Sequence, residues 1–344
     1  MSHGLNQCKF SIAHYGNCLK PKMKEQIILV TGATGFIGNA VTKSLVQGGY
    51  KVIASTRQLP TTPIPGLTQF SGRLTWQAVG AINGGTAWEP SLRGISTVIH
   101  CAARAHVMSD NDPDPGSAYR KVNVEGSVHL AKQAVLAGVK RFVFLSSIGV
   151  NGKISELPFT EIDKPNPHDA YSISKFEAEK ALMDISRETG IEVVIIRAPL
   201  VYGPKVPGNF CRLIRMVQLG IPLPFGAVHN RRSLVALDNL VSLVQLCSDA
   251  SKSPLAANQL FLAADGEDVS TTDLLRKVAR AAGCPSRLVP VPASLLQFCA
   301  AVFGVRALAV RLLCNLQVDS TKARSLLGWR PVVGLDQQLR VMFK

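Results

Sequence analysis

Short apolar runs alternate with longer helical patterns along the chain as far as Pro199. The runs are rich in Val, Ile and Leu, which is typical of parallel strands that are covered on both faces. Strands are predicted at 27–31, 51–55, 74–79, 97–101, 140–146 and 191–197. Helices are predicted at 36–47, 117–137 and 169–189. This alternation predicts the α/β class, with a doubly wound parallel sheet of the Rossmann type.

Beyond Pro199 the rhythm changes, because proline and glycine become frequent around one helical pattern near 209–219. We interpret this as the start of a smaller C-terminal α/β substrate lobe. Further helices are predicted at 238–249, 271–282, 293–313 and 319–327, with a strand at 259–263. The predicted domains are a disordered extension at 1–22, a dinucleotide-binding domain at 23–200 with about 230–250, and a substrate lobe at 201–229 and 251–330.

The chain has 344 residues and a net charge of +15, from 38 basic and 23 acidic residues. The basic residues are scattered and aromatic residues make up only 6%, so no nucleic-acid platform is indicated. An anionic cofactor and a nucleotide-linked substrate would use part of the excess charge. The eight cysteines show no zinc spacing, so no metal site is expected, and reduced thiols in a cytoplasmic protein are predicted.

No secretory signal or integral membrane segment is evident from the sequence. The apolar run 293–305 is too short to span a bilayer, and Arg306 and Arg311 interrupt the segment after it. An amphipathic core helix is the simpler interpretation of this run. Peripheral membrane association is the alternative.

A glycine-rich turn follows the first predicted strand, in the sequence Thr-Gly-Ala-Thr-Gly-Phe-Ile-Gly at 31–38. Gly32 suits the tight turn, Gly35 lets the backbone approach a pyrophosphate, and Gly38 allows close packing of helix on sheet. The free N–H groups of the following helix favour phosphate. In this context the turn predicts dinucleotide binding.

The second strand ends in Ala-Ser-Thr-Arg at 54–57, with no acidic residue. An acid there would hold the ribose 2′-hydroxyl of NAD. Thr56 and Arg57 suit a 2′-phosphate instead, because a guanidinium binds phosphate through two donors. We therefore favour NADP, with NAD as the alternative.

Tyr171 and Lys175 lie four positions apart in the predicted helix 169–189 and share one face. An ammonium group near a phenol is expected to lower the tyrosine pKa and make it a usable proton donor and acceptor. Ser146 and Ser147 close the strand at 140–146, at the edge where such sheets bind ligands. Together with the glycine turn, these residues predict an oxidoreductase.

These motifs resemble those of the extended short-chain dehydrogenase/reductase family, in its nucleotide-sugar epimerase/dehydratase branch. The resemblance covers about 26–340 and includes Arg-Ala-Pro-Leu-Val-Tyr-Gly-Pro at 197–204 and Leu-Gly-Trp-Arg-Pro at 327–331. It implies that Ser147 bonds the reacting oxygen, Tyr171 transfers the proton and Lys175 holds the nicotinamide ribose. It also implies a UDP-linked sugar substrate and a homodimer.

The resemblance extends to binding residues. The cofactor residues implied are Gly32, Thr34, Gly35, Phe36, Ile37, Gly38, Thr56, Arg57, Ala102, Ala103, Tyr171, Lys175 and Pro199. The substrate residues implied are Ser147, Asn209 and Arg232, the last through the diphosphate. The aspartate that often contacts adenine in this family is missing, because the chain reads Gly-Ala-Ile at 80–82.

Other polar residues near these motifs carry weaker expectations. Arg104 and His106 follow the fourth strand, where a solvent-exposed loop is expected and a contact with the sugar is the alternative. Asn123 is expected to make a structural hydrogen bond, with a proton relay as the alternative. Phe210, beside Asn209, is a candidate uridine contact.

The two residues directly after Ser147 limit the types of reaction that the chain is expected to catalyse. Dehydratases of this branch carry an Asp-Glu pair there, whereas this chain has Ile148 and Gly149. The chain is most similar to reductases of UDP-4-keto-6-deoxy-N-acetylhexosamines, of the UDP-N-acetylquinovosamine dehydrogenase type, which serve surface polysaccharide synthesis. A UDP-sugar 4-epimerase (UDP-glucose or UDP-N-acetylglucosamine type) is the alternative, and a non-catalytic dinucleotide-sensing protein is the second alternative. The residues at 54–57 favour NADPH as cofactor, and NADPH favours the reductase over the epimerase.

Overall fold

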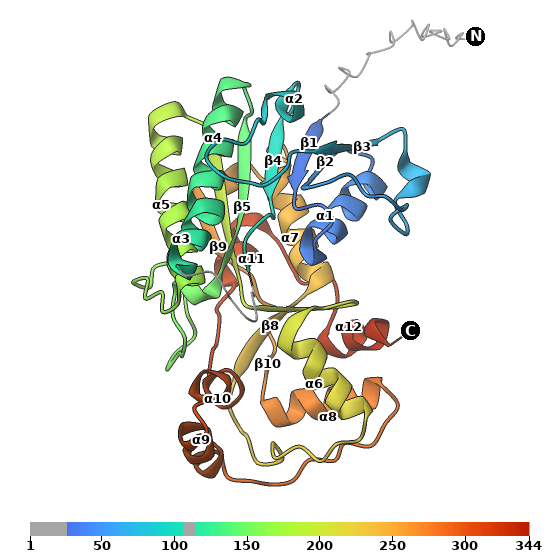
Figure 1. The fold of residues 1–344 in the computed structure, drawn as a ribbon, viewed down its shortest axis with the longest axis vertical. Coiled ribbons are helices and arrows are strands. Elements are labelled where there is room, and N and C mark those ends of the chain that lie inside the picture. The colour runs from blue at the N-terminus through green and yellow to red at the C-terminus, as the bar shows by residue number, and fades with distance from the viewer. Residues whose placement is uncertain (1–25, 106–113, 344) are drawn as a thin grey trace, which may run out of the picture.

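The computed structural model describes residues 26–105 and 114–343. A large sheet with its helices occupies one end of the molecule, and a smaller group of helices and strands occupies the other (Figure 1). The first six predicted strands are confirmed to within one residue at either end. They are β1 (Ile27–Thr31), β2 (Lys51–Thr56), β3 (Leu74–Ala78), β4 (Thr97–His100), β5 (Arg141–Ser147) and β6 (Glu192–Ala198).

The large sheet has seven strands in the order β3-β2-β1-β4-β5-β6-β9, all paired in parallel. The strand order reverses between β1 and β4, so their carboxyl ends flank a switch point where ligands bind in such sheets. The outermost strand, β9 (Gln259–Leu262), comes from a segment that the sequence-based division assigns to the substrate lobe. The domain division otherwise stays a prediction.

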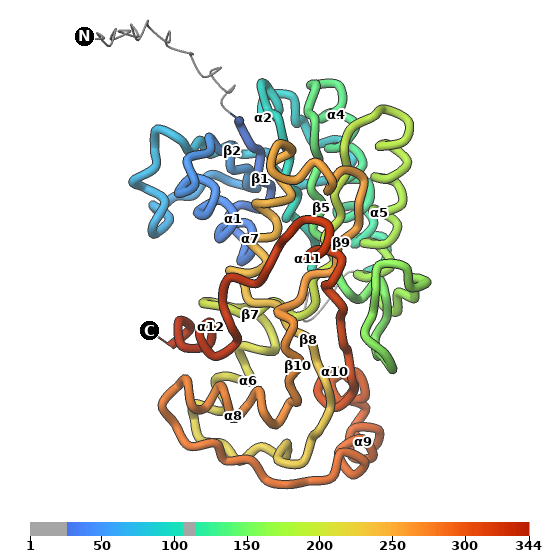
Figure 2. Tube along the Cα trace, turned by 180° about the vertical axis from the view of Figure 1, so that it is seen from behind, coloured from blue at the N-terminus to red at the C-terminus, as the bar shows by residue number. Residues whose placement is uncertain are grey.

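Helices cover both faces of this sheet, which confirms the doubly wound Rossmann arrangement (Figures 1 and 2). α1 (Phe36–Gln47) and α7 (Leu237–Ser248) share one apolar core with the sheet, joined by residues of α11 (Thr321–Leu327). α4 (Gly126–Leu136) and α5 (Ala170–Thr189) share the core on the other face, together with the fully buried Trp88 before α2 (Glu89–Leu92).

The helix predicted at 117–137 is divided into three parts. α3 (Pro115–Tyr119) leads into a π-helical turn, η2 (Arg120–Glu125), before α4 begins. Single π-turns inside α-helices are frequent at functional sites. Asn123 is buried within this turn.

The smaller part is built on three short strands that the sequence analysis does not predict. β8 (Arg232–Ala236) lies between β7 (Leu200–Tyr202) and β10 (Asp268–Val269). α6 (Gly208–Gln218), α8 (Thr271–Ala281) and α12 (Leu335–Met342) pack on a third apolar core beside this sheet. Short 3₁₀ turns complete the chain: η1 (Thr68–Phe70), η3 (Ile148–Val150) and η4 (Pro254–Ala256).

The predicted helix 293–313 is two helices, α9 (Ala293–Val302) and α10 (Arg306–Leu313). The break lies at Gly304, whose φ of +69° is in the left-handed region that favours glycine. The core-helix interpretation is wrong: α9 buries only Ala300 and α10 only Leu313. Within the described ranges no helix has the length and apolar character needed to cross a bilayer.

Candidate active site

The glycine turn lies at the switch point between β1 and β4. Gly32 has a φ of +65°, and a Cβ on it would lie 2.9 Å from the backbone N and Cα of Ala102. A Cβ on Gly38 would lie 2.2 Å from the carbonyl oxygen of Gly32, so only glycine lets α1 pack this closely. Ala102 N in turn donates to Thr31 Oγ1 at 3.2 Å. The turn is therefore closed against the end of β4.

The amino end of α1 is open to a phosphate. Its N-cap is Gly35, which carries no side chain to satisfy the first N–H groups. Thr34 and Gly35 are exposed, whereas Phe36 and Ile37 in the first turn are half-buried. A Cβ on Gly35 would lie 3.2 Å from Gly32 O, so the turn leaves room for a bound group but little for a side chain. These residues fit the pyrophosphate of a dinucleotide.

The end of β2 carries the two residues predicted to select the cofactor. Thr56 is buried and its Oγ1 donates to Gln58 O, while Arg57 is exposed. The structure thus leaves Arg57 accessible and directs the Thr56 hydroxyl to the backbone carbonyl of Gln58. Nearby, Ala103 and Pro199 follow β4 and β6 at the same edge of the sheet.

The helix that carries Tyr171 and Lys175 begins with a capping box. Asp169 Oδ1 accepts from Ser172 N at 2.7 Å, and Ser172 Oγ accepts from Asp169 N at 3.1 Å. This cap fixes where α5 starts, and hence which residues face the sheet. The structure confirms the predicted helix as α5, which carries both Tyr171 and Lys175. Lys175 points inward and is 2% exposed.

Lys175 is held against the end of the sheet. Its Nζ donates to the carbonyl of Leu145 at 2.8 Å and lies 4.4 Å from the ring centroid of Phe144. Burial lowers the pKa of Lys175 to about 8, with Cys101 and Glu179 opposing that shift. The ammonium group therefore lies beside the carboxyl ends of β4 and β5, where the predicted nicotinamide ribose would lie.

The expectation that Lys175 lowers the pKa of Tyr171 is wrong for this structure. Burial raises the pKa of Tyr171 above its ordinary value, and the charge of Asp169 raises it further. The Lys175 ammonium is directed to the Leu145 carbonyl instead. A bound positive charge beside the phenol would oppose this shift.

Arg104 lies beside the predicted catalytic tyrosine. Its guanidinium lies 5.4 Å from the ring centroid of Tyr119, and the Tyr119 and Tyr171 rings meet edge-on at 6.1 Å. The expectation of a solvent-exposed Arg104 is wrong, because the side chain is half-buried at this site. His106 lies outside the described residues.

Ser147 is brought to the amino end of α5 by Gly149. Ser147 Oγ accepts from Gly149 N at 3.1 Å. A Cβ on Gly149 would lie 3.3 Å from Ser147 Oγ and 3.2 Å from Ser172 Cβ. Glycine at this position thus lets the serine end of β5 and the first turn of α5 approach each other.

A buried network behind these residues was not found by sequence reasoning. Arg197 donates to the Glu179 carboxylate through Nε at 3.0 Å and Nη2 at 2.6 Å, and through Nη1 to Asn151 Oδ1 at 2.8 Å. Ser146 Oγ also donates to Glu179. The network joins α5, β5, β6 and the turn after η3. The sequence feature that could have indicated this network is the position of Glu179, four residues after Lys175 and therefore on the same helix face.

Asn123 makes structural hydrogen bonds, as expected. Its Oδ1 accepts from Arg104 N at 2.8 Å, and its Nδ2 donates to Arg104 O at 3.1 Å and to Ser174 Oγ at 3.0 Å. It therefore connects the loop after β4 to α5.

His100 is fully buried in β4 and forms hydrogen bonds with Thr31 Oγ1 and Ser127 Oγ. Burial lowers the pKa of His100 to about 3.

Two of the three predicted substrate residues, Arg232 and Asn209, lie in the smaller part, whereas Ser147 ends β5 of the large sheet. Arg232 begins β8; its Nη1 donates to Cys314 O at 3.0 Å, and burial lowers its pKa. Among the described residues no carboxylate forms a salt bridge with it, so it suits an anionic ligand. Asn209 is exposed at the start of α6. Phe210 is 5% exposed within the third core, so the uridine contact considered for it is wrong.

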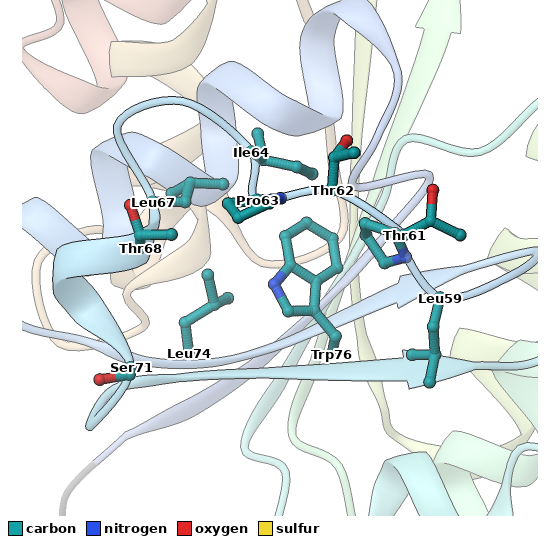
Figure 3. Close-up of a pocket in the computed structure, with 11 residues that line it drawn as sticks. Leu59, Thr61, Thr62, Pro63, Ile64, Leu67, Thr68, Ser71, Leu74 and Trp76 are labelled. Carbon is teal, nitrogen blue, oxygen red and sulfur yellow. The ribbon is translucent and has the colours of Figure 1, made fainter.

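Two cavities lie beside β3 and beside the loop that follows it. The larger, of about 510 Å³, lies between β3 and the segment after β2, with Trp76, Leu74 and Ile64 on its walls (Figure 3). It does not include the predicted catalytic residues. A second cavity, of about 430 Å³, is lined by Ala81, Ile82, Asn83, Arg104 and residues of the following helix.

Fold and site together define a dinucleotide-dependent enzyme of the Rossmann class. The profile of the NAD dependent epimerase/dehydratase family matches residues 28–257, and the chain belongs to this family. It is 43% identical to a UDP-glucose 4-epimerase of Vibrio cholerae over 323 residues, which is 93% of this chain and 95% of that protein.

Two more distant comparisons agree in family and fold. The chain is 26% identical to an N-acetyl-α-D-glucosaminyl-diphospho-ditrans,octacis-undecaprenol 4-epimerase of Escherichia coli O157:H7, covering 93% of this chain and 96% of that one. A crystal structure of UDP-glucose 4-epimerase from Thermotoga maritima with UDP-glucose superimposes with a TM-score of 0.72. It has 25% identity and covers 92% of this chain and 97% of that chain.

Proposed function

We propose that this protein is a UDP-sugar 4-epimerase that works with bound NAD. The observation that carries the proposal is the 43% identity, over nearly the whole of both chains, to a UDP-glucose 4-epimerase. This reverses the preference of the sequence analysis, which placed the 4-reductase first. The family description also names NAD, whereas the NADP preference rested on the end of β2, which has no acid and carries Thr56 and Arg57.

The chain's own residues supply the proton chemistry. Bound NAD would supply reversible hydride transfer at C4 of the sugar, which permits inversion at that carbon. Tyr171 would take the C4 hydroxyl proton and give it back, while Ser147 would donate a hydrogen bond to the same oxygen. Lys175 would hold the nicotinamide ribose. The reaction has no net change in oxidation state, so no external reductant is consumed.

The smaller part would hold the UDP group. Arg232 is buried without a carboxylate partner among the described residues and would bind the diphosphate, with Asn209 at the rim of the site. Gly32, Gly35 and Gly38 would hold the dinucleotide pyrophosphate, with Ala102 and Pro199 beside the nicotinamide. A cytoplasmic homodimer remains part of the proposal.

The test is interconversion of UDP-glucose and UDP-galactose by the purified protein without added cofactor, followed by nuclear magnetic resonance. Denatured protein should release about one NAD per chain, as expected for a tightly bound cofactor that is regenerated in each cycle. Absence of interconversion for both UDP-hexoses and UDP-N-acetylhexosamines would reject the proposal.

The reductase remains the second candidate because the end of β2 has no acid and an exposed Arg57. It predicts loss of absorbance at 340 nm when NADPH meets UDP-4-keto-6-deoxy-N-acetylglucosamine. It also predicts that Arg57→Ala weakens NADP binding by about tenfold or more and leaves NAD unchanged. Arg93→Ala, at an exposed arginine directly after α2, is the matched control.

A further inference from the structure

α9 and α10 carry an exposed apolar surface that the proposed chemistry does not use. We call it the α9–α10 patch and define it by six side chains that are each at least 45% exposed. They are Leu295, Phe298, Val302, Phe303, Val305 and Leu308. The two helices lie at the end of the molecule opposite the large sheet (Figures 1 and 2).

The composition of α9 differs from that of an ordinary surface helix. A helix that rests on a domain core carries charged residues on its outer face. α9 reads Ala-Ser-Leu-Leu-Gln-Phe-Cys-Ala-Ala-Val and has no charged residue. Phe298 is 66% exposed and Phe303, at its end, is 77% exposed. Contiguous exposed apolar side chains of this kind mark an interaction surface.

The sequence segment that contains the patch carries only basic charges. The segment 274–318 contains no Asp or Glu. Its charged residues are Arg276, Lys277, Arg280, Arg287, Arg306 and Arg311. Arg306 and Arg311 lie on α10 itself and are exposed, and Arg287 is exposed shortly before α9. The patch is therefore apolar in its centre and positive at its edge.

We propose that the α9–α10 patch docks on the surface of an anionic phospholipid bilayer. The helices have 10 and 8 residues, too short to span a membrane but long enough to lie in its interface. Their apolar side chains would enter the acyl boundary, and the arginines would meet lipid phosphates. A symmetric contact between two copies of the patch would offer these arginines no acidic partner from 274–318, because that segment contains no Asp or Glu.

Docking would orient the proposed substrate side toward the membrane. Asn230 Nδ2 donates to Leu312 O and Cys314 O, both at 3.1 Å, at the end of α10. Arg232 donates to Cys314 O in the same place. The patch is thus fixed to the strand that carries Arg232. This inference goes beyond the proposed function and does not depend on it.

The test is flotation of the full chain with vesicles of phosphatidylcholine, alone or mixed with phosphatidylglycerol. Binding is expected for the mixed vesicles, and it should weaken as salt is raised. Phe298→Asp with Phe303→Asp should weaken binding by about tenfold or more, and Arg306→Glu should weaken it selectively on anionic vesicles. Leu255→Asp, in η4, and Lys140→Glu, directly before β5, change exposed positions outside α9 and α10 and are matched controls.

Each substituted side chain is exposed. The circular dichroism of each variant and its turnover of soluble substrate should therefore match those of the parent chain. No vesicle binding by the parent chain would overturn the proposal, as would equal binding by the patch variants and the controls. A homodimer that Phe298→Asp dissociates, without any vesicle binding, would make the patch a subunit interface instead. If the variant with both Phe298→Asp and Phe303→Asp fails to fold, the vesicle binding of Arg306→Glu still tests the proposal.

Discussion

Arg197 and Glu179 form a buried ion pair between the end of β6 and α5. Each side chain is 4% exposed, and the guanidinium meets the carboxylate through both Nε and Nη2. Glu179 is four residues from Lys175, and Arg197 pairs in register with Ser146, next to Ser147. The pair therefore fixes the position of the proposed catalytic helix relative to the serine end of β5.

Arg197→Met should lower the free energy of unfolding by about 3–5 kcal/mol, because it leaves the Glu179 carboxylate buried and unpaired. Combining it with Glu179→Met should recover much of that loss, since no isolated charge remains. Urea unfolding of the two single variants and the double variant measures the coupling. A loss below about 1 kcal/mol for the single variant would show that water or another group already solvates the carboxylate.

Lys175→Met should abolish turnover and yet stabilise the protein at pH 7. Burial lowers the pKa of Lys175 from 10.5 to about 8, so the charged form is disfavoured in the folded state by roughly 3 kcal/mol. Loss of the bond to Leu145 O offsets part of this, which leaves about 1–3 kcal/mol.

The stability advantage of Lys175→Met over the parent chain should depend on pH. Between pH 8 and 10.5 the unfolded parent chain holds a proton that the folded chain has released, so parent stability rises with pH. The advantage of Lys175→Met should therefore shrink in urea unfolding at about pH 9.5. An advantage that stays constant from about pH 7 to 9.5 would contradict the lowered pKa.

Sequence reasoning located the sheet because most of its strands are short runs rich in Val, Ile and Leu that alternate with helical patterns. It located the glycine turn and the Tyr171–Lys175 spacing because those patterns are local. The Arg197–Glu179 pair depends on strand register and on the packing of α5, which no local pattern contains. α9 was misplaced because an apolar run normally indicates burial, whereas Phe298 and Phe303 face solvent. The pKa of Tyr171 was misjudged because its burial could not be read from spacing.

Gly38→Ala should weaken dinucleotide binding by about tenfold or more and destabilise the fold by about 1–3 kcal/mol. Its Cβ would lie 2.2 Å from Gly32 O, and the obstacle is backbone that cannot move without opening the turn. Gly72→Ala is the control, since a Cβ there meets nothing within 4 Å. Isothermal titration of the cofactor-stripped proteins gives the affinities. Equal affinity for Gly38→Ala and the parent chain would mean that the turn does not touch the nucleotide.

Tyr171→Phe separates catalysis from dinucleotide binding. The substitution removes the hydroxyl and keeps the ring that meets Tyr119, so the fold and cofactor affinity should match those of the parent. Turnover should fall by about a hundredfold to ten-thousandfold, because the proposed proton donor and acceptor is gone. Tyr50→Phe, whose hydroxyl bonds Asp249 in the cofactor domain, should leave turnover within a few-fold. If Tyr171→Phe retained full turnover, the proton would have to move through another group. A parent protein that binds NAD but shows no turnover on any UDP-sugar would instead support the dinucleotide-sensing alternative.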